Sequence, residues 1–201
     1  MKKVLLINGS PKEKGCTYTA LSEIAAQLQK NGVDSEIIHI GAGPHYGCIG
    51  CAACRKTGKC FRDDIANRLQ EKMRDCDGMI VGSPVHYASA CGAVCCVLDR
   101  LFYSASGEFA GKPAAAIVSC RRGGASAAFD RLNKYFTICN MPVVSSKYWN
   151  SVHGNTPDEV RQDLEGLQVM RQLADNMAWM LNGMTQPLPE REAPQRTNFI
   201  R

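Results

Sequence analysis

The chain has 201 residues, a formal net charge of +5, 45% hydrophobic residues and 21% charged residues. These values are ordinary for one globular domain with a full core. They argue against a nucleic-acid groove, because no basic run is present, and no apolar stretch has the length of a membrane span or a signal-peptide core. Eleven cysteines without a secretion signal favour a reducing, cytoplasmic setting, where clustered thiols bind metal more often than they form disulfides.

The predicted elements alternate between strand and helix along the chain. Apolar runs predict strands at 4–7, 35–40, 78–82, 114–119 and 142–145. Helical spacing of apolar residues predicts helices from Thr17 to near Asn31, from Asp63 or Asp64, from about Ala88, and from Thr156 to about Leu181. A further helix, which carries Phe129, Leu132 and Phe136, is expected after the loop at 120–124. Five strands alternating with helices predict an α/β fold, with a parallel sheet covered on both faces.

The last predicted helix has the clearest start and the longest apolar face. Thr156, Pro157 and Glu159 are suited to N-cap, N1 and N3 and predict a capping box. The apolar face of this helix is expected to comprise Val160, Leu164, Leu167, Met170, Ala174, Met177 and Leu181. Core packing explains this face without a partner helix.

The first loop carries the strongest binding signal at the ends of the strands. Asn8-Gly9-Ser10-Pro11 ends the first strand, and a polar loop leads to a helix that begins near Thr17. Unpaired N–H groups and the dipole at such a helix start favour an anion. Neither a Walker A sequence nor G-x-G-x-x-G is present, so a single terminal phosphate is the expected ligand. The alternative is an ordinary strand-to-helix turn.

The long loop 44–62 contains a compact cysteine motif. Cys48, Cys51, Cys54 and Cys60 have the spacing C-x2-C-x2-C-x5-C, with glycines between them. Three thiolates within seven residues and a fourth nearby suit a [4Fe–4S] cluster. Zinc is the competing interpretation, although four-cysteine zinc sites usually take two C-x2-C pairs from separate segments; thiols without metal are the other. The remaining cysteines are expected to pack as small apolar residues, except Cys16, whose pKa the helix start is expected to lower.

Residues in three loops resemble the flavodoxin-like NADPH-dependent FMN reductase superfamily. The matching segments are Gly9-Ser10-Pro11 with Gly15 and Thr17, Gly82 to Tyr87, Asp99-Arg100, and Arg121 to Gly124. The resemblance implies strand order 2-1-3-4-5 and bound FMN, with its phosphate in the first loop and its ring against the other two. Together, the residues and the resemblance give the FMN-binding set Ser10, Lys12, Gly15, Cys16, Thr17, Ser83, Pro84, Val85, His86, Tyr87, Ser119, Arg121, Arg122, Gly123 and Gly124. The family often has Asn where this chain has Cys16.

Within that superfamily the cysteine loop looks like that of iron–sulfur flavoproteins. The expected function is therefore an FMN-dependent oxidoreductase that passes electrons between NAD(P)H or a one-electron donor, a [4Fe–4S] cluster and FMN. The alternatives are a cluster-free NAD(P)H-dependent FMN or quinone reductase and a non-enzymatic flavodoxin-like carrier. No catalytic residue is assigned. Although Arg121 and Arg122 are candidates for a nicotinamide phosphate and His86 for a proton donor, each is equally consistent with a plain surface role.

The chain is expected to divide into a domain at 1–183 and an extended tail at 184–201. The tail has three prolines and few apolar residues beyond Phe199 and Ile200, so it should form no regular element. The family resemblance implies a homodimer or homotetramer. We expect the tail to lie on the partner subunit.

Overall fold

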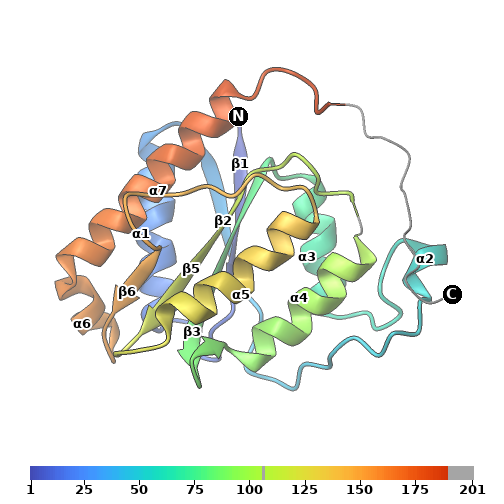
Figure 1. Ribbon diagram of the computed structural model, residues 1–201, viewed down its shortest axis with the longest axis horizontal. Helices are drawn as coiled ribbons and strands as arrows, with labels where there is room; N and C mark the ends of the chain where they lie inside the picture. The colour runs from blue at the N-terminus through green and yellow to red at the C-terminus, as the bar shows by residue number, and fades with distance from the viewer. Residues whose placement is uncertain (106, 190–201) are drawn as a thin grey trace, which may run out of the picture.

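The computed structural model describes residues 1–105 and 107–189. Its sheet has five parallel strands in the order β2-β1-β3-β5-β6, and β4 pairs only with β3 (Figure 1). The strands are β1 (Lys3–Asn8), β2 (Asp34–His39), β3 (Gly78–His86), β4 (Ser89–Ala90), β5 (Ala114–Cys120) and β6 (Ser151–His153). Because β4 is the return of a hairpin, the parallel strands have the predicted order 2-1-3-4-5, which confirms the fold class.

Helices cover both faces of this sheet (Figure 1). One face carries α1 (Cys16–Lys30), α6 (Pro157–Gln162) and α7 (Leu164–Gly183). The other carries α3 (Ile65–Arg74), α4 (Gly92–Ser104) and α5 (Ala125–Ile138), while the short α2 (Cys54–Thr57) lies beyond α4 at the periphery. Among the described residues, no helix is both long and apolar enough to cross a membrane.

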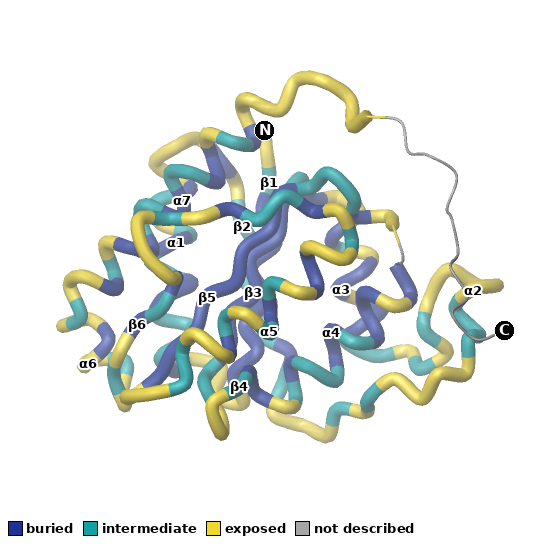
Figure 2. Tube along the Cα trace, viewed as in Figure 1, coloured by how far each residue is buried: buried dark blue, intermediate teal, exposed yellow. Residues whose placement is uncertain are grey.

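The alternation of side chains in β1 explains the two-layered core. Val4 and Leu6 pack toward α1 and α7, whereas Leu5 and Ile7 pack toward the helices on the opposite face. All four side chains are fully buried, and Figure 2 shows the same burial along the central strands. Since neither face of the sheet meets water, the loops at the strand ends are left as the places for a ligand.

The predicted helix start at Ala88 was wrong. β3 continues through His86, turns at Tyr87-Ala88 and returns as β4, so α4 begins only at Gly92. Tyr87 and Ala88 have φ values of 51° and 57°, which suit a two-residue hairpin turn of the I′ type. The usual Asn-Gly signal for that turn is absent, and the hairpin was therefore missed.

The predicted strand at 142–145 was also wrong. This stretch makes only an isolated bridge between Ala114 and Val143, and the fifth parallel strand is β6 at Ser151–His153. The intervening residues leave the sheet edge, with Tyr148 and Trp149 exposed as a tilted aromatic pair.

The predicted final helix is two helices. Thr156 caps α6 by accepting the Glu159 N–H at 3.2 Å, as predicted, but the Glu159 carboxylate accepts from Asn155 N at 2.6 Å rather than from Thr156. Asp163 then ends α6 and caps α7 through the Gly166 N–H at 2.9 Å. This break turns Leu164 to solvent, contrary to the predicted apolar face.

The described part of the tail, 184–189, forms no helix or strand and packs on its own domain through Leu188 beside Gly111. Phe199 and Ile200 lie outside the described residues, so the proposed contact of the tail with a partner subunit stays a prediction.

Candidate functional site

Three loops predicted to bind a ligand meet at the carboxyl edge of the sheet, at the bottom of Figure 1. They line one pocket of about 230 Å³ together with the loop that follows β6. Its walls are Ser10, Pro11, Lys12, Cys16, Thr17, Pro84, Val85, His86, Ser119, Cys120, Arg121, Gly154 and Asn155. Clefts that enclose a drug-sized ligand usually measure ≈ 300–1,000 Å³, so a larger molecule bound here would extend out of the pocket.

The start of α1 presents unpaired backbone donors to this pocket. Gly15 is the N-cap residue and supplies no side chain to bind the first N–H groups of the helix. Buried within the pocket, Thr17 Oγ1 and Ser119 Oγ share a hydrogen bond of 2.9 Å that ties the first loop to the third. The lining contains two cationic side chains, Lys12 and Arg121, and no carboxylate. An uncapped helix start with this charge suits a bound anion.

Asn8 shapes the first loop, and the sequence analysis did not assign it a role. Its side chain accepts the Ser10 N–H at 3.2 Å and donates to Glu13 O at 2.8 Å. His39 contacts the other side of the loop through Nε2 and Ser10 O, at 2.7 Å. An Asn at the end of a strand, two residues before the group it binds, is an Asx-turn signal that could have identified Asn8.

The second and third loops are in close contact. A Cβ placed on Gly124 would lie 2.7 Å from Ala88 Cα and 3.1 Å from Val85 Cγ1. Ser83 is turned away from the ligand side, since its Oγ accepts the Cys91 N–H and donates to Pro84 O. The Ser83 hydroxyl therefore holds the hairpin instead of facing the pocket.

The structure brings most of the predicted FMN-binding residues together but not all of them. Ser10, Lys12, Cys16, Thr17, Pro84, Val85, His86, Ser119 and Arg121 line the pocket. Gly15 lies just behind it, beside Lys12. Tyr87, Arg122 and Gly123 are exposed at the rim, and Gly124 supports the hairpin. Gly154 and Asn155 join the wall from the β6–α6 connection, which the sequence analysis missed because the fifth strand was misplaced.

The expectation for Cys16 was wrong. Burial raises the pKa of its thiol, and this effect exceeds the lowering by its backbone hydrogen bond and by Lys12. Burial, followed by the charge of Asp163, also raises the pKa of the Cys120 thiol. Both thiols therefore stay protonated at neutral pH, and neither is an activated nucleophile.

The four cysteines of the motif line one small hollow at the periphery, near α2 (Figure 1). Arg100, Tyr103 and Ser104 of α4 form its inner wall. The hollow measures about 20 Å³, which is room for one water molecule. Across residues 1–105 and 107–189, no group of three or more His, Cys, Asp or Glu side chains is close enough to hold a metal ion.

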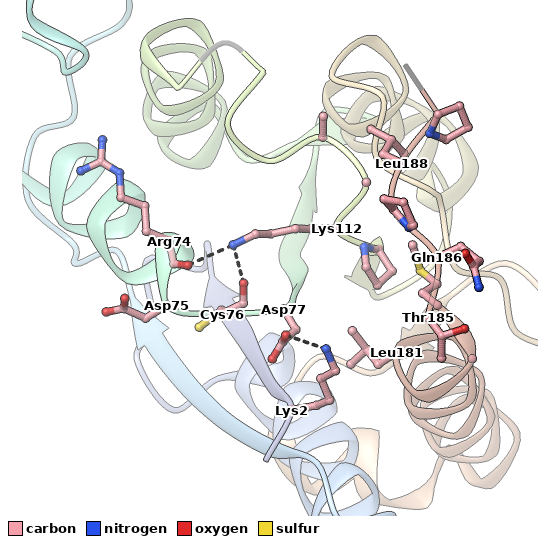
Figure 3. Close-up of a pocket in the computed structure, with 17 residues that line it drawn as sticks. Lys2, Arg74, Asp75, Cys76, Asp77, Lys112, Leu181, Thr185, Gln186 and Leu188 are labelled. Atoms are coloured by element: carbon pink, nitrogen blue, oxygen red, sulfur yellow. Dashed lines mark hydrogen bonds and ion pairs between the residues drawn. The ribbon is translucent and has the colours of Figure 1, made fainter. Parts of the chain in front are cut away.

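A larger pocket of about 580 Å³ lies at the opposite, amino edge of the sheet, between the loop after α3 and the start of the tail (Figure 3). Its cations already have partners. Lys112 donates to the carbonyls of Met73, Arg74 and Cys76 at 2.6–3.1 Å, and Lys2 forms a 3.0 Å ion pair with Asp77. Lys112 thus caps the end of α3, so its role here is structural.

Comparison with known proteins agrees with this geometry. The chain is 28% identical over 186 residues to an iron–sulfur flavoprotein of Methanocaldococcus jannaschii, covering 88% of this chain and 95% of the relative. Among solved structures, RosB with bound 8-demethyl-8-formylriboflavin-5'-phosphate superposes with a TM-score of 0.73 at 13% identity, covering 100% and 99% of the two chains. An archaeal flavodoxin superposes with a TM-score of 0.60 at 17% identity, covering 90% and 99%.

The similarity to those solved structures shows the flavodoxin-like fold. Residues 2–156, which include β1 to β6 and all three loops of the pocket, match the NADPH-dependent FMN reductase family. The chain belongs to that family and is a flavin-dependent oxidoreductase.

Proposed function

We propose that this protein is an FMN-dependent oxidoreductase of the iron–sulfur flavoprotein type, with NAD(P)H or a one-electron protein as electron donor. The observation that carries the FMN assignment is the uncapped start of α1, which opens into a pocket lined by Lys12 and Arg121 and by no carboxylate. Bound FMN supplies the chemistry, because it accepts hydride and also exchanges single electrons.

Different residues of the pocket are proposed to bind the phosphate of FMN, its flavin ring and the nicotinamide cofactor. The first N–H groups of α1, Lys12 and the Ser10 hydroxyl bind the phosphate. Since the pocket is smaller than a drug-sized cleft, the flavin ring extends out of its mouth, between the hairpin that carries Val85 and His86 and the loop at 120–124. Arg121 of the pocket wall and the exposed Arg122 are the candidates for binding the phosphate of a nicotinamide cofactor.

The cluster assignment is supported by the cysteine motif, by its placement around one hollow and by the iron–sulfur flavoprotein relative. A four-iron cluster keeps its cysteine sulfurs farther apart than a single ion does, so thiols too far apart for one metal ion are still compatible with a cluster. The hollow of about 20 Å³ must widen to admit a cluster. Cys48 and Cys51 are exposed, and their segment can move outward without disturbing the core.

Anaerobic purification of the full chain tests both assignments. We expect one FMN per chain by absorbance, with four iron atoms and four acid-labile sulfides per chain for a [4Fe–4S] cluster. FMN with zinc or with no metal would contradict the cluster. A protein that binds no FMN would contradict the whole proposal.

A cluster-free NAD(P)H-dependent FMN or quinone reductase is the second candidate, and the water-sized hollow favours it. A non-enzymatic carrier is less consistent with the chain, since typical flavodoxin carriers are expected to be acidic and this chain has a net charge of +5. Anaerobic mixing with NADPH or NADH separates these two candidates: bleaching of the flavin absorbance indicates a reductase, and an unchanged spectrum indicates a carrier.

A further inference from the structure

The four cysteines of the motif are held very unequally by the rest of the domain. Cys60 is fixed through its backbone by the buried Asn67 of α3, whose side chain accepts the Cys60 N–H at 3.1 Å and donates to Cys60 O at 2.9 Å. Asn67 also donates to Arg62 O at 3.2 Å. A buried amide that binds both backbone groups of one residue leaves that residue little freedom.

Arg100 contacts the same cysteine from α4. Its Nη1 lies 3.9 Å from Cys60 Sγ, and its Nη2 donates to Asp64 Oδ2 at 2.7 Å. The residue is only 2% exposed, and its Nε–H is buried with no hydrogen-bond partner among the described residues. Leaving a buried charged donor unpaired costs free energy, so this guanidinium has a free N–H for an acceptor that residues 1–105 and 107–189 do not supply.

Among the described residues, nothing anchors the other three cysteines in this way. Cys48 and Cys51 are exposed, in a stretch without regular structure, and Cys54 begins the four-residue α2 at the rim of the hollow. Cys60 and Arg100 therefore form the rigid inner corner of the site. The outer cysteines form its adaptable side.

We propose that Arg100 is a positioning residue of the cysteine site, which holds Cys60 in place and provides a buried positive charge and a free N–H to a cluster bound there. This inference rests on the proposed function, because it takes the four cysteines as cluster ligands. An arginine suits this place since it keeps its charge when buried and can donate to carboxylate and sulfur at once. Hydrogen bonds to sulfur and local charge are known determinants of cluster potential.

The test compares Arg100→Gln, Arg100→Lys and the wild type after anaerobic purification. We expect Arg100→Gln to release iron to a chelator about tenfold faster or more, in keeping with the usual effect of removing such a supporting group. We expect the potential of the remaining cluster to shift to more negative values, because a nearby positive charge favours the reduced form. Arg100→Lys keeps the positive charge, so its cluster potential should lie between those of the wild type and Arg100→Gln. A merely structural role would not predict this partial recovery.

Two further variants keep the test decisive. Arg68→Gln removes the same charge from an exposed position on α3 and should leave iron release and potential unchanged. Arg100→Gln with Asp64→Asn removes the carboxylate that the single variant would leave unpaired, so it protects against a general loss of folding. FMN content and circular dichroism check that each variant is folded.

The outcomes separate this inference from the proposed function. One outcome is that the wild type contains iron and a folded Arg100 variant has the same iron-release rate and cluster potential. That result would overturn the role of Arg100 and leave the cluster assignment in place. FMN without iron in the wild type would overturn both.

Discussion

Gly124, at the start of α5, lies against Ala88 of the β3–β4 hairpin so closely that a Cβ on Gly124 would come within 2.7 Å of Ala88 Cα. Gly124 also has a φ of +90°. The second and third loops of the pocket therefore hold one another in place through a position that accepts no side chain.

Gly124→Ala should lower stability and weaken FMN binding. A non-glycine residue in the left-handed region costs roughly 1–2 kcal/mol, and the clash with Ala88 must also move the hairpin. We expect the free energy of unfolding to fall by at least about 1 kcal/mol, measured by denaturant titration, with weaker FMN binding in a fluorescence titration. Gly92→Ala, at the start of α4, is the control, because nothing lies within 4 Å of a Cβ there and Gly92 is not part of the pocket wall. Equal effects of the two variants would contradict this account.

Replacing Ser10 and Thr17 together by Ala should weaken FMN binding at least about tenfold. Each hydroxyl would donate a charge-assisted hydrogen bond to the phosphate, worth about 1.5–3 kcal/mol. Thr19→Ala provides the control, since the Thr19 hydroxyl bonds to Gly15 O within the helix. Isothermal titration with FMN measures the difference, and unchanged affinity in the double variant would place the phosphate elsewhere.

Cys51→Ala should abolish the cluster and leave FMN bound. Cys51 is exposed on the outer side of the hollow and is absent from the walls of the flavin pocket. Iron, sulfide and FMN analysis of anaerobically purified protein measures both cofactors. Cys139→Ala, outside the motif, should retain iron. Full iron content in Cys51→Ala would remove this residue from the ligand set.

Glu36→Gln should destabilise the protein in a pH-dependent manner. Hydrogen bonds from Lys72 and Lys3 lower the pKa of the Glu36 carboxyl. The carboxylate therefore adds stability above the pKa of unfolded Glu, about 4.3, and this stability is lost as pH falls through the lower folded pKa. We expect a deficit of about 0.5–1 kcal/mol at neutral pH that disappears in acid. The exposed Glu71→Gln is the control, and a deficit independent of pH would refute the prediction.

Light scattering tests the proposed assembly and the role of the tail. We expect the full chain to be a homodimer or homotetramer, and a truncation after Gly183 to dissociate more readily. A monomeric full-length protein would refute the assembly. Identical oligomers from both proteins would leave 184–201 without a role in it.

Secondary-structure signals with strong physical causes, such as helix caps and buried strands, could be identified in the sequence. Asp64 caps α3 by accepting the Ala66 N–H at 3.0 Å, and the β1 run is buried on both faces. Segments with a weak local preference were predicted wrongly where the rest of the fold overrode that preference. Ser-Val-His forms the last strand because Val118 N bonds to Asn150 O beside it, and no hydrophobic run marks that segment.

The candidate site could be predicted from the sequence to a similar extent. The three loops were found because parallel strands place their carboxyl ends at one edge. Gly154 and Asn155 were not predicted to line the pocket, because their position follows from β6, and the fifth strand was predicted at 142–145 instead. Asp99-Arg100 contributed to the family resemblance, but nothing in the sequence shows that α4 turns the Arg100 charge inward against Cys60.

Neither core layer contains any of the four cysteines of the motif. The packing of both core layers therefore does not depend on the motif, unlike that of a zinc finger, whose folding free energy is the binding energy of its metal. Under the proposed function, flavin loading and cluster insertion are therefore separable events, and we expect oxidation of the motif cysteines to impair electron transfer without unfolding the domain.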